Sequence, residues 1–203
     1  NELLISSKYN ITIDLNGHTI SRNAVDSYDA GNVFYIDTNA VVTFMDSSEA
    51  KTGKVTGAIN DGNGGAFYVN KGTLRLDGIE VSGNVAKYGA GVYVTNENDS
   101  FVYVLPGTRI KNNTATSDGG GIYMNNGYLY VDGGEITGNS ANKGAGVHWA
   151  SNNKGYFTGG KIYGNTAKNN GGGVYVADYG KIFVGGDVQI TDNEVGNLYI
   201  SNK

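Results

Sequence analysis

The fold is decided by the stretch ITGNSANKGAGVHW (residues 136–149), because both halves of it recur along the chain. The second half is a glycine-rich segment that ends in three residues, of which the first and third are apolar. Seven copies of this segment are present: GNVFYI (31–36), GGAFYV (64–69), GAGVYV (89–94), GGGIYM (119–124), GAGVHW (144–149), GGGVYV (171–176) and VGNLYI (195–200). Self-similarity at a nearly fixed spacing is typical of repeat architectures, in which each copy packs on its neighbours.

The first half, an apolar-x-x-Asn segment, sets the repeat length. Copies begin at residues 20, 55 (a degenerate one), 81, 110, 136, 162 and 190, which are 35, 26, 29, 26, 26 and 28 residues apart. Alternating runs such as YLYVDG (128–133) indicate strands, and no stretch has the periodicity of an amphipathic helix. We therefore predict an all-β fold without significant helix. It is a right-handed parallel β-helix (solenoid) of about seven turns with three short strands each, forming one domain over residues 1–203.

Alternation along the strands assigns side chains to the two faces of each sheet. Three columns are predicted to point inward: Phe34, Phe67, Val92, Ile122, Val147, Val174 and Leu198; Ile36, Val69, Val94, Met124, Trp149, Val176 and Ile200; and Ile20, Val55, Val81, Ile110, Ile136, Ile162 and Ile190. One column points outward: Tyr35, Tyr68, Tyr93, Tyr123, His148, Tyr175 and Tyr199. Its middle members, Tyr68, Tyr93, Tyr123, His148 and Tyr175, are the candidate ligand-binding residues, since aromatic rings offer stacking surfaces to a glycan or an extended peptide. The alternative is that they stack on one another and only stabilise the sheet.

The corner after each apolar-x-x-Asn segment has two regular features. One position holds Gly83, Asn112, Gly138, Gly164 or Asp192, residue types that tolerate a positive φ. The next position holds a column of asparagines, which we expect to form a ladder of side-chain amides hydrogen-bonded from turn to turn: Asn84, Asn113, Asn139, Asn165 and Asn193. Two residues later Ala86, Ala115, Ala141 and Ala167 form a small inward column, which lets the chain turn tightly.

Charged residues form a second outward column, Glu80, Arg109, Glu135, Lys161 and Gln189, whose signs alternate. Opposite charges on neighbouring strands help to hold register, and a ligand-binding role is the alternative. Catalysis by paired carboxylates would need a general acid and an activated water. Asp77 and Asp132 share a position two turns apart, but both precede glycines as turn residues do. No nucleophile motif or basic companion accompanies them, so we predict no catalytic residues and no enzymatic activity.

Composition excludes several partners. The net charge is −4 with only three arginines among 203 residues, so nucleic acid is not expected. With no cysteine there is no disulfide framework, and no apolar run is long enough to insert in a membrane. No cofactor or metal is predicted, although the oxygen-rich loops at 60–63 and 96–100 leave calcium open. These loops and the segment 46–54 lengthen the repeat and are the expected places for variable recognition. Residue 1 falls inside a repeat, so we expect the chain to be a monomeric fragment of a longer surface protein.

The two segments together resemble the repeats of chlamydial polymorphic outer-membrane proteins, written FxxN and GGA[ILV]. Here the pair appears as Ile136 to Asn139 followed by Gly144 to Val147. The run IDLNGHTI (13–20) is similar to openings in the adhesin-like β-helix proteins of gut bacteria and archaea. Isoleucine or valine replaces the phenylalanine of FxxN, which favours this broader group. The resemblance implies a non-catalytic, extracellular adhesin-like or stalk module at the cell surface or wall, contacting glycans or a host or other cell surface. The alternatives are a carbohydrate-binding module of a secreted enzyme and a polysaccharide lyase or hydrolase of the pectinase type.

Overall fold

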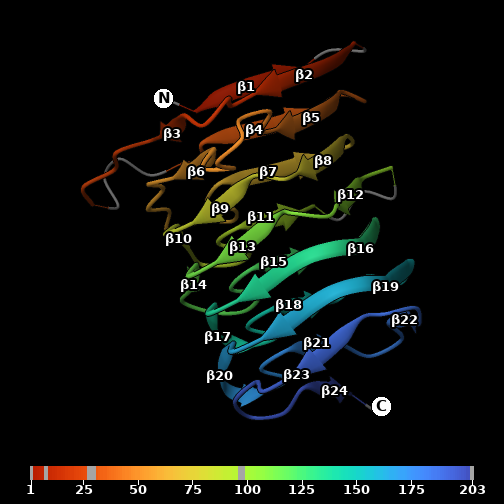
Figure 1. Ribbon diagram of the computed structural model, residues 1–203. Coiled ribbons are helices and arrows are strands. Elements are labelled where there is room, and N and C mark those ends of the chain that lie inside the picture. The colour runs from red at the N-terminus through yellow and green to blue at the C-terminus, as the bar shows by residue number, and fades with distance from the viewer. Residues whose placement is uncertain (1, 7–8, 27–30, 96–98, 202–203) are drawn as a thin grey trace.

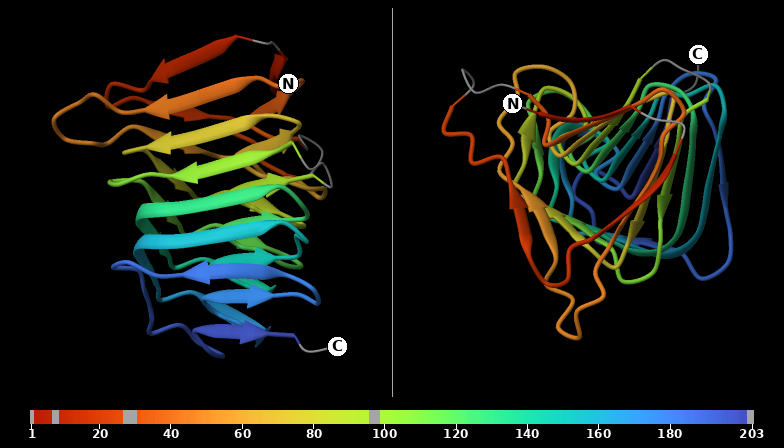
Figure 2. Two further views of the ribbon diagram at one scale, coloured as in Figure 1. Left: turned by 90° about the vertical axis from the view of Figure 1, so that its right-hand side faces the viewer. Right: turned by 90° about the horizontal axis from the view of Figure 1, so that it is seen from above.

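The computed structural model describes residues 2–6, 9–26, 31–95, 99–201. Within these ranges it contains strands and no helix, and every strand pair is parallel. The strands stack coil upon coil along one axis, with the first coil at one end of the rod and the last at the other (Figures 1 and 2). The predicted parallel β-solenoid of about seven turns is therefore confirmed.

Sheet A is built from the glycine-rich segments and has eight strands. In spatial order they are β1 (Leu3–Ser6), β4 (Phe34–Asp37), β7 (Phe67–Asn70), β11 (Val92–Val94), β15 (Ile122–Met124), β18 (Val147–Trp149), β21 (Val174–Val176) and β24 (Leu198–Ile200). Seven of them match the seven sequence copies. The eighth, β1, was missed because it has neither the glycines nor the tyrosine, and Leu4 pairs with Tyr35 at the tyrosine position.

Sheet B contains both remaining predicted strands of each coil. One half consists of β2 (Asn10–Asp14), β5 (Val41–Met45), β8 (Thr73–Asp77), β12 (Phe101–Val104) and β22 (Lys181–Val184). The other half consists of β3 (Thr19–Ser21), β6 (Lys54–Thr56), β9 (Glu80–Ser82), β13 (Arg109–Lys111) and β23 (Gln189–Thr191). Two ten-residue strands, β16 (Tyr128–Thr137) and β19 (Lys154–Tyr163), run through both halves, so the predicted second and third strands belong to one sheet.

The two halves of sheet B meet at a bend that requires glycine. Gly78, Gly107, Gly134 and Gly160 all have φ between 72° and 82° there. A Cβ added at Gly160 would lie 2.5 Å from the Gly134 carbonyl oxygen. Glycine therefore both supplies the left-handed backbone and lets successive coils approach closely at this line.

Sheet C lies after the asparagine corner, where the sequence suggested only a turn. It consists of β10 (Val85–Ala86), β14 (Thr114–Ala115), β17 (Ser140–Lys143) and β20 (Thr166–Asn170). The predicted alanine column is buried in this sheet. The predicted positive φ occurs at Gly83, Asn112, Gly138, Gly164 and Asp192.

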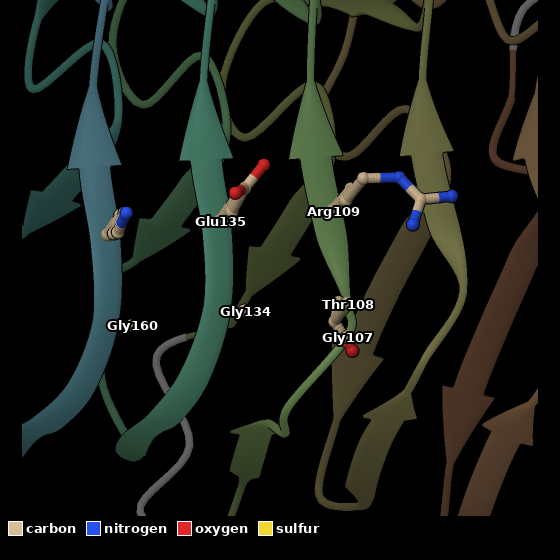
Figure 3. A pocket seen from close by; sticks show the side chains of 7 residues that line it. Gly107, Thr108, Arg109, Gly134, Glu135 and Gly160 are labelled. Carbon is tan, nitrogen blue, oxygen red and sulfur yellow. The ribbon is translucent and has the colours of Figure 1, made fainter. Parts of the chain in front are cut away.

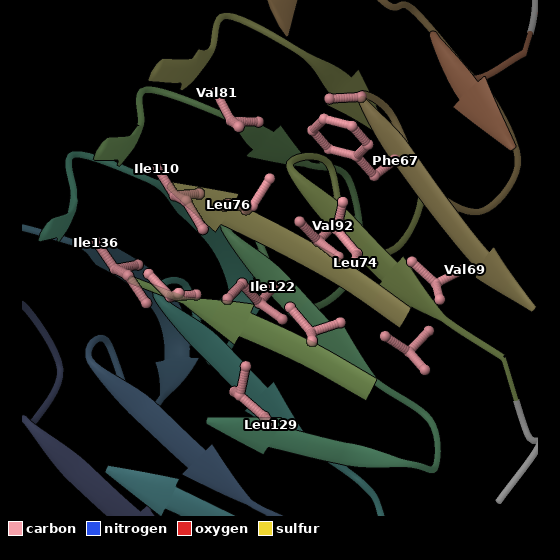
Figure 4. Close-up of a cluster of buried hydrophobic side chains, with 14 of the residues drawn as sticks. Phe67, Val69, Leu74, Leu76, Val81, Val92, Ile110, Ile122, Leu129 and Ile136 are labelled. Atoms are coloured by element: carbon pink, nitrogen blue, oxygen red, sulfur yellow. The ribbon is translucent and has the colours of Figure 1, made fainter. Parts of the chain in front are cut away.

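The core is one continuous stack of apolar side chains between the sheets (Figure 4). The three predicted inward columns are fully or almost fully buried in the middle coils. In the last coil Leu198 and Ile200 are 42% and 53% exposed, because no coil of the described chain covers them. The inward assignment is thus confirmed, and burial depends on having a neighbour on both sides.

Candidate functional site

The predicted ligand-binding column lies on the outer face of sheet A as one uninterrupted stack of rings. From Tyr35 to Tyr199, successive ring centroids are 4.6, 5.2, 5.5, 4.7, 4.8 and 5.2 Å apart. Tyr93, His148 and Tyr175 are each less than 9% exposed. Because each inner ring is covered on both faces, a ligand would meet only ring edges and hydroxyl groups. This geometry favours the interpretation that the column stabilises the sheet, and ligand binding by it stays a prediction.

His148 is a buried histidine within this stack of tyrosines. Its ring lies between Tyr123 and Tyr175, and its Nδ1 atom has no hydrogen-bond partner in the described part of the chain. Burial lowers the pKa of His148 to about 4, aided by the nearby Lys143 charge and opposed by a hydrogen bond with the Lys143 backbone. The imidazole is therefore neutral at physiological pH and packs as an aromatic ring.

We expect His148 to make folding sensitive to mild acid. Between pH 6.5 and 4 the unfolded chain takes up a proton that the folded chain excludes, so stability falls as the pH is lowered. The loss reaches about 2–3 kcal/mol near pH 4, from the ordinary histidine value and the lowered one. Urea denaturation of the wild type and of His148→Tyr at a series of pH values measures it. Tyrosine occupies the other six positions of the column, so the variant should lose this part of the pH dependence, and parallel curves for the two proteins would contradict the prediction.

The asparagine ladder is present as predicted and is structural. Asn84, Asn113, Asn139 and Asn165 are fully buried. From Asn113 to Asn193, each Oδ1 accepts the backbone N–H and the side-chain amide of the asparagine one coil before it, at 2.9–3.1 Å. Asn84, the first of the ladder, accepts the backbone N–H of Ala58 instead. At the end of the ladder Asn193 donates to Asn197 of its own coil. All these amides are used within the protein, so they are not available to a ligand.

The glycine-rich segments leave the room that the ladder needs. A Cβ added at Gly121 would lie 2.6 Å from the Gly146 carbonyl oxygen and 3.1 Å from Nδ2 of Asn139. The two recurring sequence segments are therefore adjacent in space. The glycines of one segment leave room for the asparagine side chains of the other.

A groove that the sequence did not predict runs along the bend of sheet B. It consists of three hollows on neighbouring coils, of about 210, 310 and 350 Å³. The first and second share Gly107 and Arg109, and the second and third share Glu135 and Lys161. We call this continuous surface the bend groove, and Figure 3 shows its middle part.

The later part of the alternating charge column, from Arg109 through Glu135 and Lys161 to Gln189, lines the bend groove, and its earlier members lie beside it. Register places Lys54, Glu80, Arg109, Glu135, Lys161 and Gln189 on successive coils. The ion pairs gather at Glu80, whose carboxylate lies 3.6 Å from Lys54, 3.6 Å from Arg109 and 2.8 Å from Lys111. Burial acts to raise the pKa of Glu80, but Lys111 and Ser82 hydrogen bonds and the nearby cations hold it below its usual range.

Farther along the groove the charges are left unpaired. In Figure 3 the Arg109 side chain turns away from Glu135 and toward the neighbouring strand β9. Glu135 accepts a hydrogen bond of 3.3 Å from the Tyr163 hydroxyl. Within the described ranges Lys161 forms no ion pair or side-chain hydrogen bond. The expected sign alternation is present, while continuous pairing along the column is not.

One long loop beside the groove is fixed rather than open. Asp46, only 1% exposed, accepts backbone N–H groups of Gly17 at 2.8 Å, Ser48 at 3.0 Å and Gly53 at 2.5 Å. Burial acts to raise the pKa of Asp46, and these hydrogen bonds outweigh it and bring the pKa to about 2. The segment 46–54, where we expected variable recognition, is therefore held in place by these hydrogen bonds and forms one wall of the groove. In the 60–63 loop Asn60 is similarly used by backbone contacts, and residues 96–98 lie outside the described residues.

A second aromatic column lies on the outer face of sheet B. Tyr103, Tyr130, Tyr156 and Phe183 stack with centroids 4.7, 5.1 and 5.2 Å apart, and Arg75 lies over the Tyr103 ring at 4.6 Å. The sequence signal was the aromatic residue at the third place in FVYV (101–104), YLYV (128–131) and KGYF (154–157).

The structure gives no support to a catalytic pair. Asp77 lines one hollow of the groove, whereas Asp132 binds the Thr158 hydroxyl at 2.7 Å. The residue between them in register is Leu105, as the neighbouring Val104 pairs show. Among the described residues no cluster of three or more histidine, aspartate or glutamate side chains could hold a metal ion, and no helix could span a membrane.

No protein-family model, curated protein or solved structure matches the chain.

Proposed function

We propose that the chain is a non-catalytic binding module of a cell-surface protein, a rod that holds an extended ligand such as a glycan along the bend groove. The observation that carries the proposal is the continuity of the groove across neighbouring coils. A groove parallel to the axis suits a linear polymer, because each coil can contact one unit of the chain. Display at the cell surface follows from the resemblance to adhesin-like repeats and is part of the same proposal.

The rigidity of the groove supports binding by a preformed surface. Its floor is the bend of sheet B, where backbone hydrogen bonds join each coil to the next, and one wall is fixed by the Asp46 clamp. A preformed site avoids the entropic cost of ordering a loop when the ligand binds.

Two carboxylates in and beside the groove favour binding over catalysis. A general acid or base works best with a pKa near the operating pH, which for a carboxyl requires an upward shift. The pKa values of Glu80 and Asp46 are shifted downward instead. Both carboxylates are committed to hydrogen bonds that hold structure.

We expect purified protein to bind glycans on an array of host, microbial and plant oligosaccharides and to release no products from them. Incubation with pectins and other uronates should give neither reducing ends nor unsaturated sugars. The same protein denatured in urea is the control for nonspecific adsorption to the array. A clean negative on the array would leave a spacer role only. Turnover that is lost in Asp77→Ala or Asp132→Ala would show instead that the protein is an enzyme.

A further inference from the structure

Four asparagines of the chain are followed directly by glycine: Asn16, Asn63, Asn126 and Asn170. In such a pair the backbone nitrogen of the glycine can attack the side-chain amide carbon of the asparagine, because glycine has no side chain to hinder the approach. The attack requires the glycine N–H to lose its proton, so a hydrogen bond donated by this N–H protects the pair. The hydrogen bonds of the four glycines therefore decide which pair can react.

Three of the four glycine N–H groups are held by hydrogen bonds. Gly17 donates to the buried carboxylate of Asp46 at 2.8 Å. Gly64 and Gly171 each donate to a backbone carbonyl of the next coil, at 2.8 and 3.0 Å. Each of these bonds joins two coils, so it is lost only when the coils separate locally. These three pairs are protected as long as the rod is folded.

Gly127 differs from the other three glycines. In the part of the chain that the structure describes, its N–H has no hydrogen-bond partner, although the residue is buried and its carbonyl oxygen accepts from the Ser151 hydroxyl at 2.9 Å. An unpaired buried N–H raises the free energy of the folded state. Ring closure at this pair replaces the N–H bond by an N–C bond, so it sacrifices no hydrogen bond and removes an unpaired donor.

The side chain of Asn126 is polarised for the attack. Its Oδ1 accepts from Nδ2 of Asn153 at 3.1 Å, and the Ser151 hydroxyl, shared with the Gly127 carbonyl, lies 3.1 Å from it. These donors of the next coil point at the oxygen on which negative charge develops during the attack. Asn126 lies in the turn between β15 and β16 and is partly exposed, so water can reach the reaction product.

We propose that the pair Asn126 and Gly127 is a site of spontaneous covalent modification, at which Asn126 deamidates while the other three asparagines stay intact. The Gly127 nitrogen bonds to Cγ of Asn126 as its proton passes to hydroxide from the solvent. The bond between Cγ and Nδ2 breaks, and the nitrogen takes a proton from water and leaves as ammonia. Water then opens the succinimide at either carbonyl, which gives aspartate or isoaspartate. The site is independent of the bend groove and of the proposed function.

The two products change the turn in different ways. Aspartate keeps an oxygen where Oδ1 of Asn126 accepts from Asn153, and it adds a negative charge. Isoaspartate lengthens the backbone between β15 and β16 by one atom. The reaction is irreversible, so the modified fraction increases with the age of the protein.

The test is peptide mapping by mass spectrometry after ageing the full chain at mildly alkaline pH, folded in buffer or unfolded in guanidinium chloride. The unfolded chain supplies the intrinsic rate of each pair. In the folded chain Asn126 should deamidate at least about tenfold faster than Asn16, Asn63 or Asn170, since a protecting hydrogen bond of about 1.4 kcal/mol corresponds to a tenfold change in rate. Exposure alone predicts the opposite order for two of them, because Asn16 is exposed and Asn126 only partly so.

A pair of variants tests the protection directly. Asp46→Ala removes the acceptor of the Gly17 N–H and should raise the deamidation rate of Asn16 about tenfold. Asp46→Asn is the matched control, because its amide oxygen can still accept the Gly17 N–H and should keep Asn16 protected. Unchanged rates at Asn63 and Asn170 in both variants show that the rod is still folded.

The proposal is overturned if all four pairs are equally protected in the folded chain, or if the exposed Asn16 is lost first. A rate at Asn16 that does not respond to Asp46→Ala would also overturn it, because the hydrogen bond would then offer no protection. Faster loss at Asn126 only, together with release of Asn16 by Asp46→Ala, supports it.

Discussion

Asn139→Ala is expected to destabilise the rod by about 4 kcal/mol, a large part of the stability of a typical domain. Oδ1 of Asn139 accepts the backbone N–H and the side-chain amide of Asn113 at 3.0 and 3.1 Å. Its Nδ2 donates to the Ile110 carbonyl at 2.9 Å. The truncation leaves the Asn113 backbone N–H without a partner where no water reaches, takes one of two acceptors from the Asn113 side-chain amide, and removes a donor from the Ile110 carbonyl. Each buried group that loses its partner costs about 1–3 kcal/mol.

Asn139→Asp is the sharper variant of the same experiment. The carboxylate can still accept from Asn113, but it faces the Ile110 carbonyl and Oδ1 of Asn165 with no proton to donate. We expect a loss at neutral pH at least as large as for alanine, and a partial recovery in acid as the carboxyl becomes protonated.

Urea denaturation followed by circular dichroism measures both variants. Asn142→Ala is the control, because Asn142 makes an exposed amide hydrogen bond of 3.2 Å to the Thr116 carbonyl one coil away. It should cost less than about 1 kcal/mol. A loss at Asn139 no larger than at Asn142 would mean that the ladder is dispensable.

The second large effect is expected at the pair formed by Trp149 and Gly155. Trp149 is fully buried, and its ring occupies the space beside Gly155. A Cβ added at Gly155 would lie 3.2 Å from both Cη2 and Cζ3 of Trp149. Gly155 pairs with Leu129 and Ile182, so a glycine replaces the large apolar residue of that column where the tryptophan reaches across.

Each single change should therefore be costly, and the double change should not. Trp149→Val opens a cavity and should cost about 3 kcal/mol. Gly155→Leu forces the new side chain into the indole ring and should cost about as much. The double variant copies the valine and leucine of neighbouring coils, and it removes the buried Trp149 Nε1, which has no partner in the described chain.

Equilibrium unfolding of the four proteins gives the coupling energy. We expect the double variant to recover most of the two losses, which corresponds to an interaction of about 3 kcal/mol or more between contacting sites. Losses that simply add would show that Trp149 does not fill the space of the missing side chain.

The sequence by itself determined the parts of the protein that repeat. Alternation and the recurring glycines and asparagines specified strands, the inward columns, the positive-φ corner and the ladder from Asn84 to Asn193, because parallel coils in register place equivalent residues above one another. Strand β1 was missed because LLIS has neither the glycines nor the tyrosine that mark the other copies.

Only the tertiary structure decided what depends on distances between different columns. It joined the second and third strands into one bent sheet, stacked the ring faces of the tyrosine column against each other, placed the indole of Trp149 over Gly155, and aligned three hollows into a groove beside Lys161. The physical reason is that register along one column is set by the repeat, whereas the bend angle and the filling of space across the coil are set by side-chain packing, which periodicity does not encode.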